Sequence, residues 1–212
     1  YGADGNSVNV PLNRDRMPVE EMYPFLNGES LGDYYDRYME SSANILLLIG
    51  PPGTGKTTFI RGLLQHSEAS AIVSYDSNVL EKDYVFANFI EGEKNVLVLE
   101  DADMFLKARS EGNTMMHKFL NVGDGLVTTR NKKLIFSTNL PSIRDIDSAL
   151  IRPGRCYDIL HFEELTQTQA EKLAEKVGTK LNRERESWSI ADVFFEQNTN
   201  TKKTIENKMG FV

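Results

Sequence analysis

The segment from Gly50 to Thr57 reads GPPGTGKT and directly follows the apolar run Asn44–Ile49. This is the spacing of a phosphate-binding P-loop, and its position predicts that the loop joins a strand to a helix. Gly53 and Gly55 let the backbone take unusual dihedrals and approach anionic oxygens closely. The motif therefore predicts a fold in which a phosphorylated ligand binds between the end of a strand and the N-terminus of a helix.

Each position of this loop has an expected task in binding a nucleoside triphosphate. Pro51 and Pro52 stiffen the entry but carry no N–H group, so the backbone donors must come from the residues that follow. Lys56 brings a positive charge to the outer phosphates, and the hydroxyl of Thr57 is a hard oxygen ligand suited to Mg²⁺. The residues expected to bind the nucleotide are Gly50, Pro51, Pro52, Gly53, Thr54, Gly55, Lys56, Thr57 and Thr58.

Short apolar runs alternate with helical stretches over most of the chain. Strands are expected at Asn44–Ile49, Ala71–Ser74, Asn95–Leu99, Lys133–Thr138 and Tyr157–Phe162. Helices are expected at about Leu31–Ser41, Lys56–Gln65, Asn78–Glu91, Asn113–Val122 and Asp145–Leu150. Such alternation indicates a parallel sheet covered on both faces. We therefore expect an α/β P-loop NTPase fold, three-layered α/β/α with a five-stranded parallel sheet.

The pattern changes once the last of these strands ends. Apolar residues recur at steps of three and four from Ala170 to Leu181, and Thr166 and Gln169 have the spacing of a capping box. A second short helix is expected at Ile190–Phe195, with Trp188 packed in this helical piece. The sequence thus predicts three parts: an N-terminal arm or linker over 1–20, an α/β nucleotide-binding domain over 21–164 and a small C-terminal helical lid over 165–212.

Two adjacent acids, Glu100 and Asp101, end the third expected strand. In P-loop enzymes the acid at this strand end holds the Mg²⁺ shell, and a second acid can act as a base toward water. By position Glu100, together with Thr57, would hold the metal and Asp101 would polarise water. The usual order is Asp then Glu, so the expected base is one methylene shorter here. Asp103 is a less favoured participant, and an ordinary polar strand end is the alternative reading of the pair.

The segment 135–156 reads IFSTNLPSIRDIDSALIRPGRC and resembles the second region of homology of the AAA family of ATPases. The resemblance implies that Asn139 orients the attacking water and that Arg152 and Arg155 are arginine fingers that enter a neighbouring subunit's site. A guanidinium can neutralise charge on the γ-phosphate oxygens, whereas isolated arginines would be solvated charges worth little. The expected catalytic residues are Lys56, Glu100, Asp101, Asn139, Arg152 and Arg155.

The resemblance covers about residues 40 to 180 and implies ATP and Mg²⁺ as ligands. Glu100–Asp103 and Phe119–Gly125 are most similar to the subgroup that includes the mitochondrial translocase that assembles the Rieske subunit, and to small ATPases of bacteria and phages. The resemblance implies Mg-dependent ATP hydrolysis by a ring-forming homo-oligomer, expected to be a hexamer, that remodels an unidentified protein or nucleic-acid substrate. The alternatives are an ATP-switched nucleic-acid loader or replication accessory ATPase, and a monomeric P-loop kinase, which the arginine motif disfavours.

One feature departs from the family's unfoldases, which place an aromatic-apolar-Gly pore loop shortly after the second strand. Here Ser74–Leu80 reads SYDSNVL and has no glycine, so threading of a polypeptide is not expected. Nearby Tyr84 and Phe86 are expected in the core or at an interface.

Charge and composition narrow the remaining classes. The net charge of −7 makes sequence-independent nucleic-acid binding a poor default, and the basic turn Arg130–Lys133 is expected to be a solvated loop. The single cysteine, Cys156, rules out an internal disulfide and is expected to be a small buried hydrophobe. No apolar run is long enough for a membrane segment. A cytoplasmic location is expected, or the host cytoplasm if a phage encodes the chain.

Overall fold

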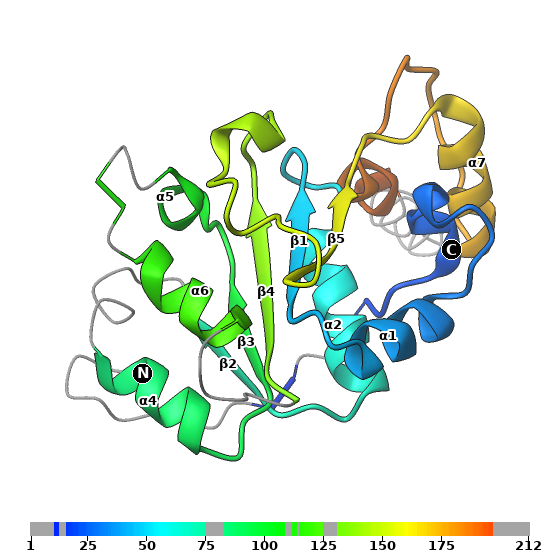
Figure 1. Ribbon diagram of the computed structural model, residues 1–212. Helices are drawn as coiled ribbons and strands as arrows, with labels where there is room; N and C mark the ends of the chain where they lie inside the picture. The colour runs from blue at the N-terminus through cyan, green and yellow to red at the C-terminus, as the bar shows by residue number, and fades with distance from the viewer. Residues whose placement is uncertain are drawn as a thin grey trace, which may run out of the picture.

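A five-stranded sheet forms the centre of the protein (Figure 1). The computed structural model describes residues 11–12, 16–74, 83–108, 112–113, 115–124 and 131–196. The strands are β1 (Ile45–Ile49), β2 (Ala71–Ser74), β3 (Val96–Leu99), β4 (Lys133–Thr138) and β5 (Cys156–His161). All four neighbouring pairs are parallel, in the order β2-β3-β4-β1-β5. The expected five-stranded parallel sheet is confirmed.

Helices cover both faces of this sheet (Figure 1). The helices of the described residues are η1 (Glu20–Met22), η2 (Pro24–Leu26), α1 (Leu31–Glu40), α2 (Lys56–His66), α4 (Asp83–Glu91), α5 (Asp103–Leu106), α6 (Met116–Asp124), η4 (Ile143–Asp145) and α7 (Gln167–Lys176); residues 190–196 are also helical. Helices α1 and α2 lie on one face, and α4, α5 and α6 on the other (Figure 1). The three-layer architecture therefore agrees with the expected α/β/α fold.

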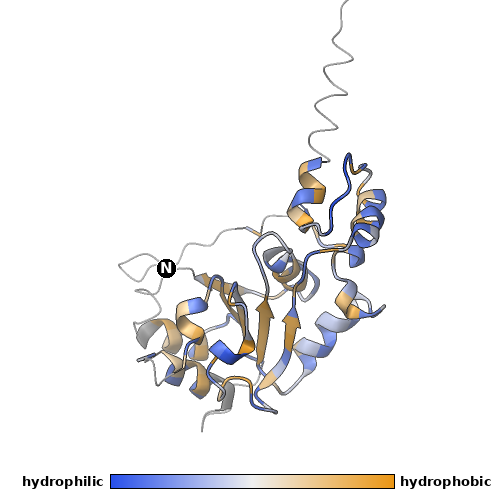
Figure 2. Ribbon diagram, turned by 90° about the horizontal axis from the view of Figure 1, so that it is seen from above, coloured by the Kyte–Doolittle hydropathy of each residue, from blue (hydrophilic) through white to orange (hydrophobic). Residues whose placement is uncertain are grey.

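Strand β1 shows why the sheet is sandwiched between two cores. It pairs with β4 on one side and β5 on the other, and all five of its residues are buried, because helices cover both faces of the sheet. Leu46 and Leu48 pack into the cluster under α1 and α2, whereas Ile45 and Leu47 pack into the cluster under α4 and α6. Successive side chains of a strand point to opposite faces, so an unbroken apolar run fills both cores. Figure 2 shows the strands as largely hydrophobic.

The prediction of a helix at Asp145–Leu150 is wrong. The structure has the short 3-10 helix η4 over Ile143–Asp145, followed by turns. The backbone polar groups in this stretch find partners outside a helix. The Asp147 carboxylate accepts a bond from the N–H of Ala149 at 2.9 Å, and the Arg155 side chain donates to the Ala149 carbonyl. Asp side chains of this kind compete with helical bonding.

The prediction that the basic turn is a solvated loop is also wrong for two of its residues. Lys132 and Lys133 are 8% and 1% exposed. The Lys133 Nζ donates to the carbonyls of Ser41 at 2.6 Å and Ala43 at 3.1 Å, beyond the end of α1. Lys132 likewise donates to two carbonyls just after α4, at 2.6 and 2.8 Å. Carbonyls near helix ends lack helical partners, so a lysine whose stem runs through apolar surroundings can satisfy them. Arg130 lies outside the described residues.

The chain after β5 forms the expected helices. Thr166 and Gln169 make the capping box of α7, and Trp188 is fully buried with its ring N–H donating to Gln167 Oε1 at 2.7 Å. Leu173 of α7 belongs to the same apolar cluster as α1 and α2. This helical piece therefore shares a core with one face of the sheet. The domain limits at residues 20 and 164 stay a prediction.

Several smaller expectations can be placed. Phe86 is buried in the core, whereas the pore-loop departure at residues 75–80 lies outside the described residues. Cys156 is half-buried, and burial raises the pKa of its thiol to about 12. Across the described ranges, none of the helices has the length and apolar character that a membrane crossing requires. The cytoplasmic location stays a prediction.

Candidate active site

The loop from Gly50 to Gly55 joins β1 to α2, as expected. A Cβ on Gly50 would lie 2.1 Å from the carbonyl oxygen of Phe162, so only glycine lets the loop pass this close to the end of β5. Gly55 has φ of 91° and stands at the N-cap of α2, where no side chain caps the helix. The first N–H groups of α2 thus have no capping side chain and can bind an anion. Tyr23 steadies this turn by donating to the Gly55 carbonyl at 3.1 Å.

Lys56 lies at the centre of the site and is 8% exposed. Its Nζ donates to the carbonyls of Gly50 at 2.5 Å and Pro51 at 2.9 Å, and to Asn139 Oδ1 at 2.9 Å. Burial lowers the pKa of Lys56, and the nearby charges of Asp101, Asp103 and Glu100 oppose that shift. The contact with Asn139 joins the P-loop to the end of β4, so two expected site residues meet directly.

The two acids at the end of β3 face different partners. Glu100 is 8% exposed and accepts a bond from Thr57 Oγ1 at 2.5 Å. Asp101 is exposed, and its Oδ1 accepts from Asn139 Nδ2 at 3.1 Å. Asp101 also has a left-handed backbone, with φ of 50°. Asp is tolerated there far better than most residues, which gives a physical reason for the shorter acid at this position.

These residues line a pocket of about 330 Å³. Of the residues expected to act here, Pro52, Gly53, Gly55, Lys56, Thr57, Thr58, Glu100, Asp101 and Asn139 line it. Gly50, Pro51 and Thr54 do not line it but support the loop. The carbonyls of Gly50 and Pro51 hold Lys56, and the Thr54 hydroxyl donates to the Pro51 carbonyl at 2.8 Å.

Sequence reasoning missed several of the residues that line the pocket. Arg16, Ser137, Ile190, Ala191 and Phe194 also line it. The Arg16 guanidinium lies 5.7 Å from the centre of the Phe194 ring. Ile190–Phe195 was expected as a helix, and nothing in its sequence indicates that it faces the loop. Arg16 lies in the expected arm, where no pattern marks a binding residue.

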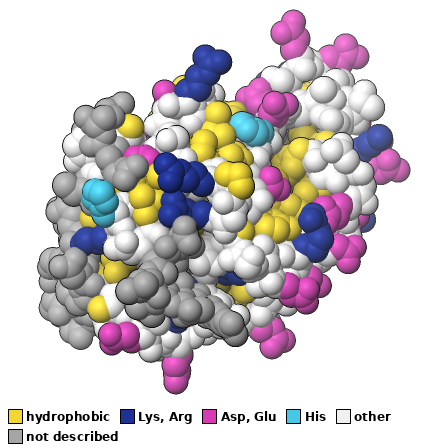
Figure 3. Space-filling model, viewed as in Figure 1, with side chains coloured by type: hydrophobic (Ala, Val, Ile, Leu, Met, Phe, Trp, Pro, Cys, Tyr) yellow, Lys and Arg dark blue, Asp and Glu magenta, His cyan; other side chains and the backbone are white. Residues whose placement is uncertain are grey.

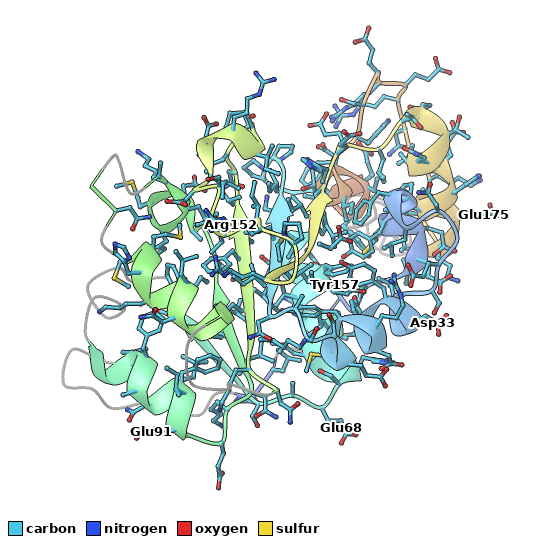
Figure 4. All side chains as sticks on the ribbon, viewed as in Figure 1. Asp33, Glu68, Glu91, Arg152, Tyr157 and Glu175 are labelled. Atoms are coloured by element: carbon cyan, nitrogen blue, oxygen red, sulfur yellow. The ribbon has the colours of Figure 1, made fainter. Side chains whose placement is uncertain are left out.

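The two expected arginine fingers stand apart from this pocket. Neither Arg152 nor Arg155 is among the described residues that line it. Arg152 is exposed, and Figure 4 shows it on the loop before β5, in front of β4. Arg155 is half-buried and donates to the carbonyl of Ala149 in its own loop. Figure 3 shows Lys and Arg side chains gathered near the middle of this face. Of the two, Arg152 is therefore the one presented at the surface.

Comparison with known proteins fits this arrangement. The profile of the ATPase family associated with various cellular activities (AAA) matches residues 46–164. The chain belongs to this family. The AAA chain is 32% identical over 127 residues to 26S proteasome regulatory subunit 8 of Caenorhabditis elegans, covering 52% of this chain and 30% of that protein. It is 28% identical over 164 residues to the probable mitochondrial chaperone bcs1 of Schizosaccharomyces pombe, covering 71% and 34%. The chain thus spans about a third of these relatives.

The site residues of this AAA chain fit a nucleotide and a divalent cation. The glycine positions keep the loop open to phosphate oxygens, and the start of α2 lacks a capping side chain. The Thr57 hydroxyl and the Glu100 carboxylate are adjacent hard oxygen donors. Mg²⁺ in such sites takes only one or two protein ligands and completes its shell with phosphates and water. Thr57 and Glu100 are thus sufficient as the protein's share.

Proposed function

We propose that this AAA chain hydrolyses ATP with Mg²⁺ as a ring-forming oligomer, expected to be a hexamer, and remodels a protein or nucleic-acid partner. The observation that carries the proposal is one pocket in which side chains from the ends of three strands meet. Lys56 follows β1, Asp101 follows β3 and Asn139 follows β4, and Asn139 bonds to both of the others. Phosphoryl transfer needs positioned charges of this kind more than covalent chemistry.

Binding is assigned to the P-loop and the start of α2. Backbone N–H groups of this turn would hold phosphate oxygens, and Lys56 would neutralise the outer phosphates. Thr57 and Glu100 would hold Mg²⁺, which when bound neutralises charge that develops on the phosphates. The apolar side chains of Ile190 and Phe194, which also line the pocket, suit the uncharged base.

The activation of water is assigned to Asn139 and Asp101, which are hydrogen-bonded to each other beside Lys56. Asn139 would orient a water, and Asp101 would accept its proton as the water oxygen bonds to the γ-phosphorus. The bond from that phosphorus to the bridging oxygen breaks, and ADP leaves. The 3.1 Å bond between Asn139 and Asp101 keeps the two groups on the same side of the site. Both can therefore contact the same water, as the proposed roles require.

A further positive charge, an arginine finger, is assigned to a neighbouring copy of the chain. Arg152 is exposed and does not line its own pocket, which supports a role in the site of an adjacent subunit. Such an arginine is worth on the order of 10³–10⁵ in rate in related P-loop enzymes. Arg155 is proposed as the second such arginine, and the bond from its side chain to the Ala149 carbonyl ties it to the loop that carries Arg152.

Phosphate release measured against protein concentration tests the proposal. We expect the specific activity to rise with concentration, to require Mg²⁺ and to be lost in Lys56→Ala. A rate per chain that is constant with dilution, from a particle of monomer size, would contradict a shared site. Transfer of the γ-phosphate to an acceptor other than water would indicate a kinase, and salt-sensitive stimulation by DNA would indicate a nucleic-acid loader.

A further inference from the structure

The third acid after β3, Asp103, holds the end of β4. Its Oδ1 accepts a bond from the hydroxyl of Thr138 and another from the backbone N–H of Asn139 at 3.0 Å. The Thr138 hydroxyl in turn accepts from the N–H of Leu140 at 3.1 Å. One carboxylate oxygen therefore fixes three consecutive residues, directly or through a single hydroxyl.

The strand ladder does not supply this support. Pairing between β3 and β4 ends at Leu99 and Phe136, and pairing between β1 and β4 ends at Ile49 and Thr138. The N–H of Asn139 lies beyond both ladders. A buried or half-buried backbone N–H needs a partner, and here the Asp103 carboxylate supplies it.

The turn after β3 brings Asp103 into place. Asp101 takes a left-handed conformation, and the N–H of Ala102 donates to the carbonyl of Ser137 at 2.8 Å. Helix α5 then begins at Asp103, beside the strand end that it holds. Asp101 and Asp103 thus contact Asn139 from the same turn. The Asp101 carboxylate accepts from the side-chain amide of Asn139, and the Asp103 carboxylate accepts from its backbone N–H.

We propose that Asp103 is a positioning residue that sets the place of the Asn139 amide between Lys56 and Asp101. The inference rests on the proposed hydrolysis and deepens it. Asp103 does not line the pocket, so it touches neither the nucleotide nor water and acts through Asn139. Its charge also favours the protonated form of Lys56, an effect that Asp103→Asn removes while keeping the contact with Asn139. Displacement of a catalytic group by about 1 Å can cost on the order of 10²-fold in rate, so loss of this support is expected to lower kcat.

The test is a double-mutant cycle on kcat with Asp103→Ala and Asn139→Ala. We expect Asp103→Ala to lower kcat on the order of 10²-fold, with the affinity for a fluorescent ATP analogue changed by less than about twofold. In the Asn139→Ala background the same change is expected to have little further effect, because the group it positions is gone. Asp103→Asn keeps an acceptor oxygen and is expected to restore most of kcat.

Met104→Ala is the matched control, because Met104 is on the same short helix and is 68% exposed. An Asp103→Ala defect that is equally large with and without Asn139 would overturn the inference while leaving ATP hydrolysis in place. A loss of nucleotide affinity in parallel with kcat, or no rescue by Asp103→Asn, would also overturn it. Absence of hydrolysis by the unaltered chain would overturn the proposed function and, with it, this inference.

Discussion

At the scale of single residues, short hydrogen bonds between side chains hold the candidate site together. Lys56 bonds to Asn139, Asn139 to Asp101, and Thr57 to Glu100. The reversed order of the two acids places aspartate at a left-handed backbone position, where glutamate would be less favourable. The shorter acid and the local backbone are therefore matched, and Asn139 reaches it directly.

Asp101→Asn tests the assigned base. The amide keeps the size of the side chain and suits the left-handed backbone, so the fold and ATP binding are expected to remain. Turnover is expected to fall on the order of 10²–10⁴-fold, because the amide cannot take a proton from water. The measurement is phosphate release at saturating ATP, with the exposed Glu40→Gln as the matched acid-to-amide control. Turnover that is unchanged in Asp101→Asn would exclude the assignment.

The two arginines are expected to differ when each is changed to alanine. Arg152→Ala is expected to lower turnover on the order of 10³-fold or more with no change in melting temperature, since Arg152 is exposed. Arg155→Ala is expected to lower the melting temperature as well, because Arg155 bonds the Ala149 carbonyl. Calorimetry beside the phosphate assay separates the two effects. Equal effects of the two changes on stability would show that Arg155 does not support its loop.

At the scale of elements, the sequence was informative where the signal is local. The P-loop glycines, the apolar run of β1 and the capping box of α7 each depend on residues close together in the chain. Predictions failed where distant partners decide. The turns after η4 depend on Arg155, and the burial of Lys132 and Lys133 depends on carbonyls beyond the ends of α4 and α1. No periodicity in one sequence reveals such partners.

The candidate site divides in the same way. The part of its lining supplied by the P-loop and the end of β3, including Lys56 and Glu100, could be predicted because motif spacing identifies it. The rest of the lining could not, because Arg16 and Phe194 are far apart in sequence and meet only in the fold. The support of Asn139 by Asp103 was missed because it depends on where two strand ladders stop.

Lys133 makes the junction of α1 and β4 sensitive to pH. Burial lowers the pKa of Lys133 from 10.5 to about 8. The unfolded chain therefore binds more protons than the folded chain between these pH values, and the free energy of unfolding rises with pH there. Lys133 is expected to contribute a rise of about 2 kcal/mol between roughly pH 7.5 and 9.5. The Cys156 thiol, whose pKa is raised by burial, contributes a smaller change of opposite sign, so the Lys133 contribution is the difference between the unaltered chain and Lys133→Met. Urea denaturation at several pH values measures it.

Lys133→Met is expected to remove this rise, since it removes the titrating group. It is also expected to lower stability, because the carbonyls of Ser41 and Ala43 lose their donor. Lys172→Met is the matched control, because Lys172 is exposed and the rise is expected to persist there. A rise of the same size in Lys133→Met would show that other groups cause it.

At the scale of the whole molecule, the pocket draws on more than the segment that the family profile matches. Arg16 precedes that segment, and Ile190, Ala191 and Phe194 follow it. The end of the chain's N-terminal arm and the helical piece both face the P-loop. The pocket thus combines residues of the matched segment with residues on both sides of it, yet the arginine assigned to complete the site, Arg152, lies outside.

Mixing two inactive variants tests the shared site most directly. Arg152→Ala chains keep an intact pocket, and Asp101→Asn chains keep an intact arginine. In a ring built from equal amounts of both, about a quarter of the interfaces would join an intact pocket to an intact arginine. We therefore predict that phosphate release reappears on mixing. Arg152→Ala chains mixed with the double variant Arg152→Ala/Asp101→Asn are the control and are predicted to stay inactive. Mixed rings that form but release no phosphate would contradict the account.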